Sequence, residues 1–155
     1  MISLPKISPL DIMWMTIAVS VGCLVIYLGE RFLNVSLGVF YGINTFNPIW
    51  VINLIVVPLL AGLVVSFIYG LGGKMLAHIP PIPIQVYHYM QLDSQTLPEG
   101  VSLLPIGYWI LILIVCVEAA AAGGFIGEVI IKRTYGRRPK HLVHKRYQVK
   151  DLDES

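Results

Sequence analysis

Long runs of apolar residues dominate the chain and are separated by short polar stretches. Residues 12–29 and 49–73 contain no charged side chain. The first run ends at Glu30-Arg31, the second in a glycine-rich turn, and a third ends at Lys132-Arg133. A helix of about 20 apolar residues crosses a hydrocarbon core of about 30 Å. We therefore expect an all-α integral membrane protein with three transmembrane helices, at residues 10–28, 49–71 and 105–131.

The composition agrees with a membrane protein. Of the 155 residues, 56% are hydrophobic and 13% are charged, whereas a soluble domain is about 25% charged. Eight of the eleven Lys and Arg residues lie from Lys132 onward. The sequence thus divides into a membrane domain, 1–131, and a basic tail, 132–155. A net charge of +2 gives no reason to expect a specific nucleic-acid partner.

The basic tail predicts the orientation. We expect the chain in the inner (plasma) membrane of a cell. Basic segments next to membrane helices remain on the cytoplasmic side, so we expect the tail in the cytoplasm. Three crossings would then place the N-terminus and an outer loop, 74–104, outside. The first basic residues of the tail are expected to contact lipid headgroups or a partner, and a structural lipid is expected to bind: these residues are Lys132, Arg133, Arg137 and Arg138.

Tryptophan positions and two connecting segments complete the predicted layout. Trp14, Trp50 and Trp109 each lie near the start of a span, as expected for interfacial anchors. Residues 32–46 are apolar but too short to span, which favours a short helix in the interface or a re-entrant segment. Residues 79–84 contain three prolines, which predict an extended stretch that lies on the membrane or on a partner.

Two acids interrupt the third span. Glu118 lies near its midpoint, where a carboxylate is costly and usually faces a bundle interior or water. It is interpreted as a polar contact that joins helices, with a proton-translocation site and a cofactor or lipid contact as alternatives. Glu128 lies four residues before Lys132, a spacing that predicts an ion pair on the helix surface.

Small residues recur at intervals of four in all three spans. Such spacing lets helices approach closely. On the third span the stripe falls on the face opposite Glu118, so this helix is expected to have neighbours on two sides. Whether these contacts are within the chain or between chains stays open. The predicted packing residues are Ala18, Gly22, Gly62, Ser66, Gly70, Ala120, Gly123, Gly124 and Gly127.

The sequence contains no complete set of catalytic groups. It has no phosphate-binding loop, nucleophile elbow or zinc-protease motif, and its four histidines lie outside the predicted spans, so we expect neither an enzyme nor a metal or cofactor bound by this chain alone. The leading hypothesis is a non-catalytic subunit of a multi-subunit inner-membrane complex, in electron transfer or ion transport. The alternative is a homo-oligomeric channel or proton-translocating protein that uses Glu118. The three-span layout is also similar to one class of phage holins, which would imply a pore former, although the long proline-rich loop departs from that class.

Overall fold

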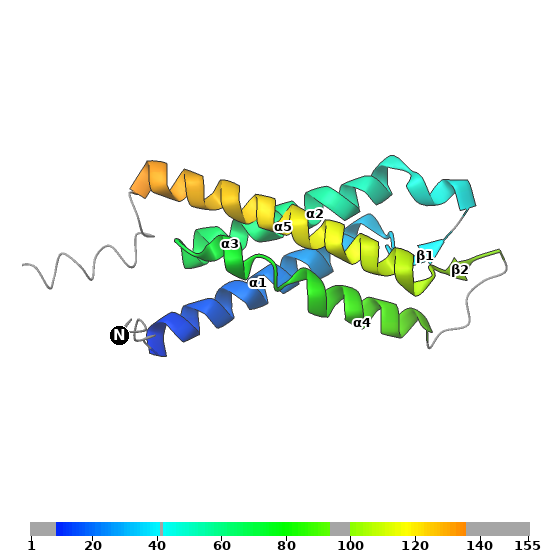
Figure 1. Cartoon of the computed structure of the whole chain (residues 1–155), viewed down its shortest axis with the longest axis horizontal. Helices are drawn as coiled ribbons and strands as arrows, with labels where there is room; N and C mark the ends of the chain where they lie inside the picture. Colours follow the sequence, from blue (N-terminus) through cyan, green and yellow to red (C-terminus); the bar gives the residue numbers. More distant parts are fainter. Residues whose placement is uncertain (1–8, 41, 94–99, 136–155) are drawn as a thin grey trace, which may run out of the picture.

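The computed structural model describes residues 9–40, 42–93 and 100–135, which form a helical bundle with a small two-stranded sheet at one end (Figure 1). The elements are α1 (Pro9–Leu33), β1 (Val39–Phe40), the 3₁₀ helix η1 (Gly42–Phe46), α2 (Pro48–Tyr69), α3 (Gly73–Leu76), α4 (Pro81–Asp93), β2 (Ser102–Leu103) and α5 (Ile106–Tyr135). Helices α1, α2 and α5 are long and apolar enough to cross a membrane. The predicted helical membrane protein with three such spans is confirmed. Arg137 and Arg138 lie outside the described residues.

The closest contact in the bundle joins α2 to α5. A Cβ atom added to Gly62 would lie 1.9 Å from the carbonyl oxygen of Ala120, and one added to Gly123 would lie 1.9 Å from that of Leu59. The Ser66 hydroxyl donates a hydrogen bond of 2.7 Å to the carbonyl oxygen of Gly124. The two backbones therefore touch directly, as small residues permit. All nine residues predicted for helix packing are buried.

The contacts also fix the directions of the long helices. Along α1 and α2, Gly22 packs against Val65 and Gly29 against Val57, so these helices are antiparallel. Along α2 and α5, the Cys116 thiol donates to the carbonyl oxygen of Leu54 in the first half of both helices, and Ser66 meets Gly124 further on. Helices α2 and α5 are therefore parallel, and the start of α1 and the end of α5 lie at the same end of the bundle (Figure 1).

Because α2 and α5 are parallel, the chain between them has to return along the bundle. Residues 73–93 make this return path as α3, four turn residues and α4 (Figure 1). The expected loop over 74–104 does not fit this arrangement, because residues 74–93 run along the bundle as helix and turn. The expected extended proline stretch is also wrong. Pro81 and Pro83 lie in the first turn of α4, where a helix needs no backbone N–H donor.

The segment before α2 closes the other end of the bundle. Helix α1 ends at Leu33, and Asn34 follows with a φ of 52°, a conformation that asparagine tolerates better than most residues. Val39 then pairs with Leu103, and Phe40 with Ser102, in an antiparallel β1–β2 ladder. Of the short helix expected over 32–46, the structure contains η1, and residues 32–40 are the end of α1, a connecting turn and β1. The ladder joins the end of α1 to the start of α5.

The glycine contact between α2 and α5 predicts a position-specific loss of stability. We expect Gly123→Ala to lower the free energy of unfolding in detergent by about 1–3 kcal/mol, because the methyl group has to displace the backbone of Leu59. Gly107→Ala is the matched control in α5, since no heavy atom of the described residues lies within 4 Å of an added Cβ there. Equal thermal unfolding curves for the two variants would contradict the contact.

Candidate functional site

Glu30 is a buried acid within the bundle. It is the last member of a stripe of buried residues on α1, which recurs every fourth position: Ala18, Gly22, Ile26 and Glu30. Its side chain is 6% exposed. The preceding Gly29 packs against Val57, near the middle of α2, so Glu30 lies well inside the bundle. Helix α1 continues past Glu30 and Arg31 to Leu33, so these two residues do not end the helix.

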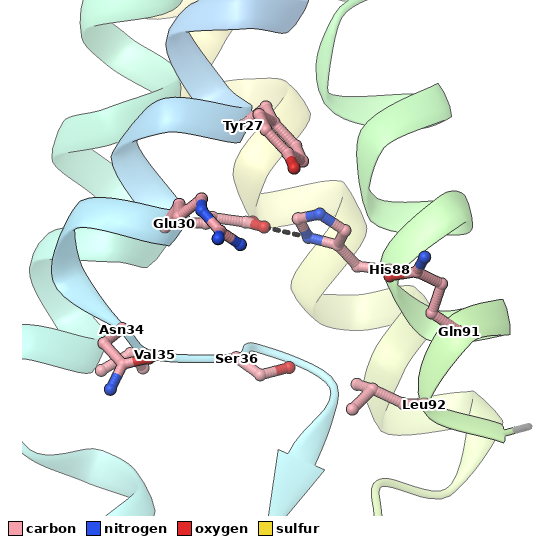
Figure 2. A pocket seen from close by; sticks show the side chains of 9 residues that line it. Tyr27, Glu30, Asn34, Val35, Ser36, His88, Gln91 and Leu92 are labelled. Atoms are coloured by element: carbon pink, nitrogen blue, oxygen red, sulfur yellow. Dashed lines mark ion pairs between the residues drawn. The ribbon is translucent and has the colours of Figure 1, made fainter. Parts of the chain in front are cut away.

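Helix α4 supplies both partners of the Glu30 carboxylate. The Gln85 amide nitrogen donates a hydrogen bond to one oxygen, and Nδ1 of His88 pairs with the other. Figure 2 shows the side chains of Glu30, on α1, and His88, on α4, pointing toward each other. Gln85 is buried. A buried carboxylate is stable when each oxygen has a donor, so this pair of contacts holds α4 against α1.

A polar cleft opens beside this pair, between the C-terminal parts of α1 and α4 (Figure 2). Its volume is about 560 Å³. Its walls carry hydroxyl, amide, imidazole, carboxylate and guanidinium groups: the lining residues are Tyr27, Glu30, Arg31, Asn34, Val35, Ser36, His88, Gln91 and Leu92. The described residues contain no group of three or more His, Cys, Asp or Glu side chains able to hold a metal ion. The lining of the cleft is mainly polar and charged.

Glu118 lies outside this cleft, on the outer face of α5. Its side chain is exposed, and no described residue forms a hydrogen bond or ion pair with it. The neighbouring side chains on this face are exposed and apolar, among them Leu111, Ile114 and Phe125. The buried stripe of α5, which includes Cys116 and Ala120, faces the opposite way. The predicted second neighbour, which would shelter Glu118, is absent among the described residues.

Glu128 holds the start of the return path. Its side chain is 3% exposed, and one carboxylate oxygen accepts hydrogen bonds from the backbone N–H groups of Gly72, at 2.7 Å, and Lys74, at 3.2 Å. The expected ion pair with Lys132 is therefore wrong, because these N–H groups take its place. Lys132 and Arg133 are exposed near the end of α5.

The tryptophans lie near helix starts, as the sequence predicts, but two of them face the protein. Trp50 and Trp109 are buried. Phe46 meets Trp50 edge to face with ring centroids 5.3 Å apart, and Tyr89 lies against Trp109 at 4.6 Å. These contacts attach η1 to α2 and α4 to α5. Trp14 is partly buried on α1.

Sequence reasoning missed the cleft because its lining residues, apart from Tyr27, lie outside the three apolar runs. Gln85 and His88 fall in the segment expected to be a loop, and Glu30 was interpreted as the end of a span. One signal could have identified Glu30. The spacing from Ala18 to Gly22 continues through Ile26 to Glu30, which places the acid on the packing face of its helix.

Comparison of the chain with known protein families, with curated proteins and with solved structures found no match. Two features of the chain itself bear on its function, the cleft and the outer face of α5.

The Glu30–His88 contact predicts non-additive stability effects. We expect His88→Leu to lower the free energy of unfolding by about 1–3 kcal/mol, because it leaves a buried carboxylate oxygen without a donor. In a chain that already carries Glu30→Gln, the same change should cost less than half as much.

His78→Leu serves as the matched control. His78 bonds to backbone oxygens of its own turn, those of Lys74 and Met75, so its effect should not depend on Glu30. A double-mutant cycle on unfolding in detergent measures both couplings. Strictly additive effects of the Glu30 and His88 changes would refute the contact.

Proposed function

We propose that the chain is a non-catalytic subunit of a larger assembly in a cell's inner membrane, held there by the outer face of α5. The observation that supports this is the position of Glu118, exposed near the middle of α5 and without a partner among the described residues. An ionised side chain at the centre of a membrane helix costs about 3 kcal/mol on insertion scales. A neighbouring chain that supplies a hydrogen-bond or charge partner removes that cost.

The interior of the chain supports a subunit better than a self-contained pore. Two clusters of buried apolar residues lie between Glu30, with its partners on α4, and Glu128, with its partners at the start of α3. They comprise Ile26, Val57 and Ala61, and then Ala18, Val65, Leu76 and Ala77. In the described residues, a polar path from one end of the bundle to the other would have to cross these clusters. The alternative function, an oligomeric channel or proton-translocating unit, therefore requires a path between chains, along Glu118.

The directions of the helices support an orientation with both chain ends in the cytoplasm. Lys74 lies on α3, at the end of the bundle where α1 begins and α5 ends. In the sequence, Lys6 precedes α1 and eight basic residues follow from Lys132. Ten of the eleven basic residues thus belong to the segments at this end, which the positive-inside rule assigns to the cytoplasm. Residues 73–93 would then make a fourth, interrupted crossing.

A labelling experiment tests this orientation. We expect reporter fusions at the N-terminus and at the C-terminus to report the same, cytoplasmic side, because α1 enters and α5 leaves at one end of the bundle. A third reporter inserted after residue 96, in the segment between α4 and β2, should report the outer side. Reporters that place the two chain ends on opposite sides would contradict four crossings and restore the three-crossing topology.

Substitution of Glu118 tests the proposed assembly. We expect the chain, purified in mild detergent, to elute with partner chains, and Glu118→Leu to release it as a smaller species, because leucine cannot replace the polar contact. Size-exclusion chromatography with mass spectrometry of the peak measures this. Leu24→Ala, at an exposed apolar position of α1, is the control and should leave the assembly intact.

The outcomes separate the two functions. If the purified chain is monomeric whether or not Glu118 is replaced, the subunit proposal is wrong. If instead the chain alone conducts ions in liposomes, and Glu118→Gln abolishes the flux while the oligomer remains, the channel function is supported.

A further inference from the structure

Arg31 and Glu118 lie at nearly the same depth in the bundle. Arg31 follows two residues after Gly29, which packs against Val57 of α2. Glu118 follows two residues after Cys116, which bonds to Leu54 of α2. Because α1 runs antiparallel to α2 and α5 runs parallel to it, both charged residues lie level with about the same turn of α2. Their positions along the axis of α2 differ by no more than roughly 5 Å.

The two residues lie on opposite flanks of the molecule. Helices α2 and α4 each pack against both α1 and α5, so α1 and α5 are on either side of them. Arg31 lines the cleft on the α1 side, and Glu118 projects from the α5 side, away from the buried stripe. One flank therefore presents a cation inside a concave, polar wall, and the other presents an acid on a convex, apolar helix face.

Each charge lacks a counter-charge within the described residues. Arg31 and Glu118 are both exposed. Among the described residues, the ion pair that forms joins Glu30 to His88. Glu30 does not serve Arg31, because its two oxygens are occupied by Gln85 and His88. Charged side chains at this depth in a membrane pair with one another or face water, and no described residue pairs with Arg31 or Glu118.

We propose that Glu118 of one copy enters the Arg31 cleft of a second copy, so that copies with the same orientation in the membrane join head to tail. This inference rests on the proposed function, since it names the partner that covers Glu118. A cleft of about 560 Å³ has room for the carboxylate, and guanidinium and carboxylate groups form charge-assisted hydrogen bonds. A head-to-tail contact repeats from copy to copy and forms either a closed ring or an open filament.

The apolar side chains around the two charges fit the same contact. Phe32, next to Arg31, is 89% exposed, and Leu28 is also exposed. On the other flank Leu111, Ile114 and Phe125 surround Glu118 and are exposed as well. Packing one set on the other would enclose the ion pair in an apolar rim and exclude competing water, as in stable interfaces.

Charge reversal in the full-length chain, reconstituted in nanodiscs or mild detergent, tests the proposal. Native mass spectrometry should find an oligomer of the wild-type chain. Arg31→Glu alone and Glu118→Arg alone should each weaken self-association about tenfold or more, because like charges then face each other. The chain with both changes should recover association to within about threefold of the wild type. Arg133→Glu, an exposed cation near the end of α5, should have no comparable effect.

A mixing experiment shows that the single variants are folded. Mixing Arg31→Glu chains with Glu118→Arg chains should restore oligomers in which the two alternate, because every contact then joins opposite charges. Failure of both the double variant and the mixture to associate, where the wild type does, would overturn the head-to-tail contact.

The remaining outcomes separate this inference from the proposed function. If Glu118→Arg releases other proteins while the chain never binds itself, the contact between copies is wrong and the subunit function stands. If Arg31→Glu changes the amount of phospholipid that purifies with the chain but not its oligomeric state, a lipid headgroup occupies the cleft and the inference fails. A monomer in all variants, without partners, refutes both proposals.

Discussion

The parallel contact between α2 and α5 is the constraint on which the rest of the structure depends. At Gly62 and Gly123 the space of a single methyl group is occupied by the carbonyl oxygen of the neighbouring helix. Because α2 and α5 are parallel, the chain that connects the end of α2 to the start of α5 has to run back along their length. The return path, 73–93, meets this need, and it brings Gln85 and His88 against Glu30. Without the parallel pair there would be no cleft.

Two buried carboxylates hold the return path at its two ends. Glu128 of α5 accepts the backbone N–H groups of Gly72 and Lys74 at the start of α3. Glu30 of α1 binds Gln85 and His88 of α4. Between them the path is interrupted before Pro81, and Pro80 packs against Gly22. Glu30 and Glu128 thus accept hydrogen bonds from the polar groups of the return path, 73–93. This explains why both acids are buried.

The sequence predicted the three long helices because each is a run of apolar residues that ends at charges, prolines or glycines. The nine small residues that it singled out are buried, because their spacing follows the helical repeat. The direction of the third helix was not predictable in the same way. Residues 73–93 contain Lys74, His78, Gln85 and His88, so their composition indicates a loop, although α3 and α4 pack along α1 and α5. The sequence suggested that Glu118 makes a polar contact between helices, and its exposure on α5 places that contact on the outer face of the bundle.

The distance between the starts of α2 and α5 tests the central claim, the parallel packing of these helices, most directly. Val51 and Ile110 are exposed near these starts and can carry spin labels in a chain with Cys23→Ala and Cys116→Ala. Parallel packing predicts a narrow distance distribution within about 20 Å, because packed helix axes lie 8–10 Å apart. A distance of about 30 Å or more, the length of a 20-residue helix, would show that α2 and α5 are antiparallel and would contradict the account.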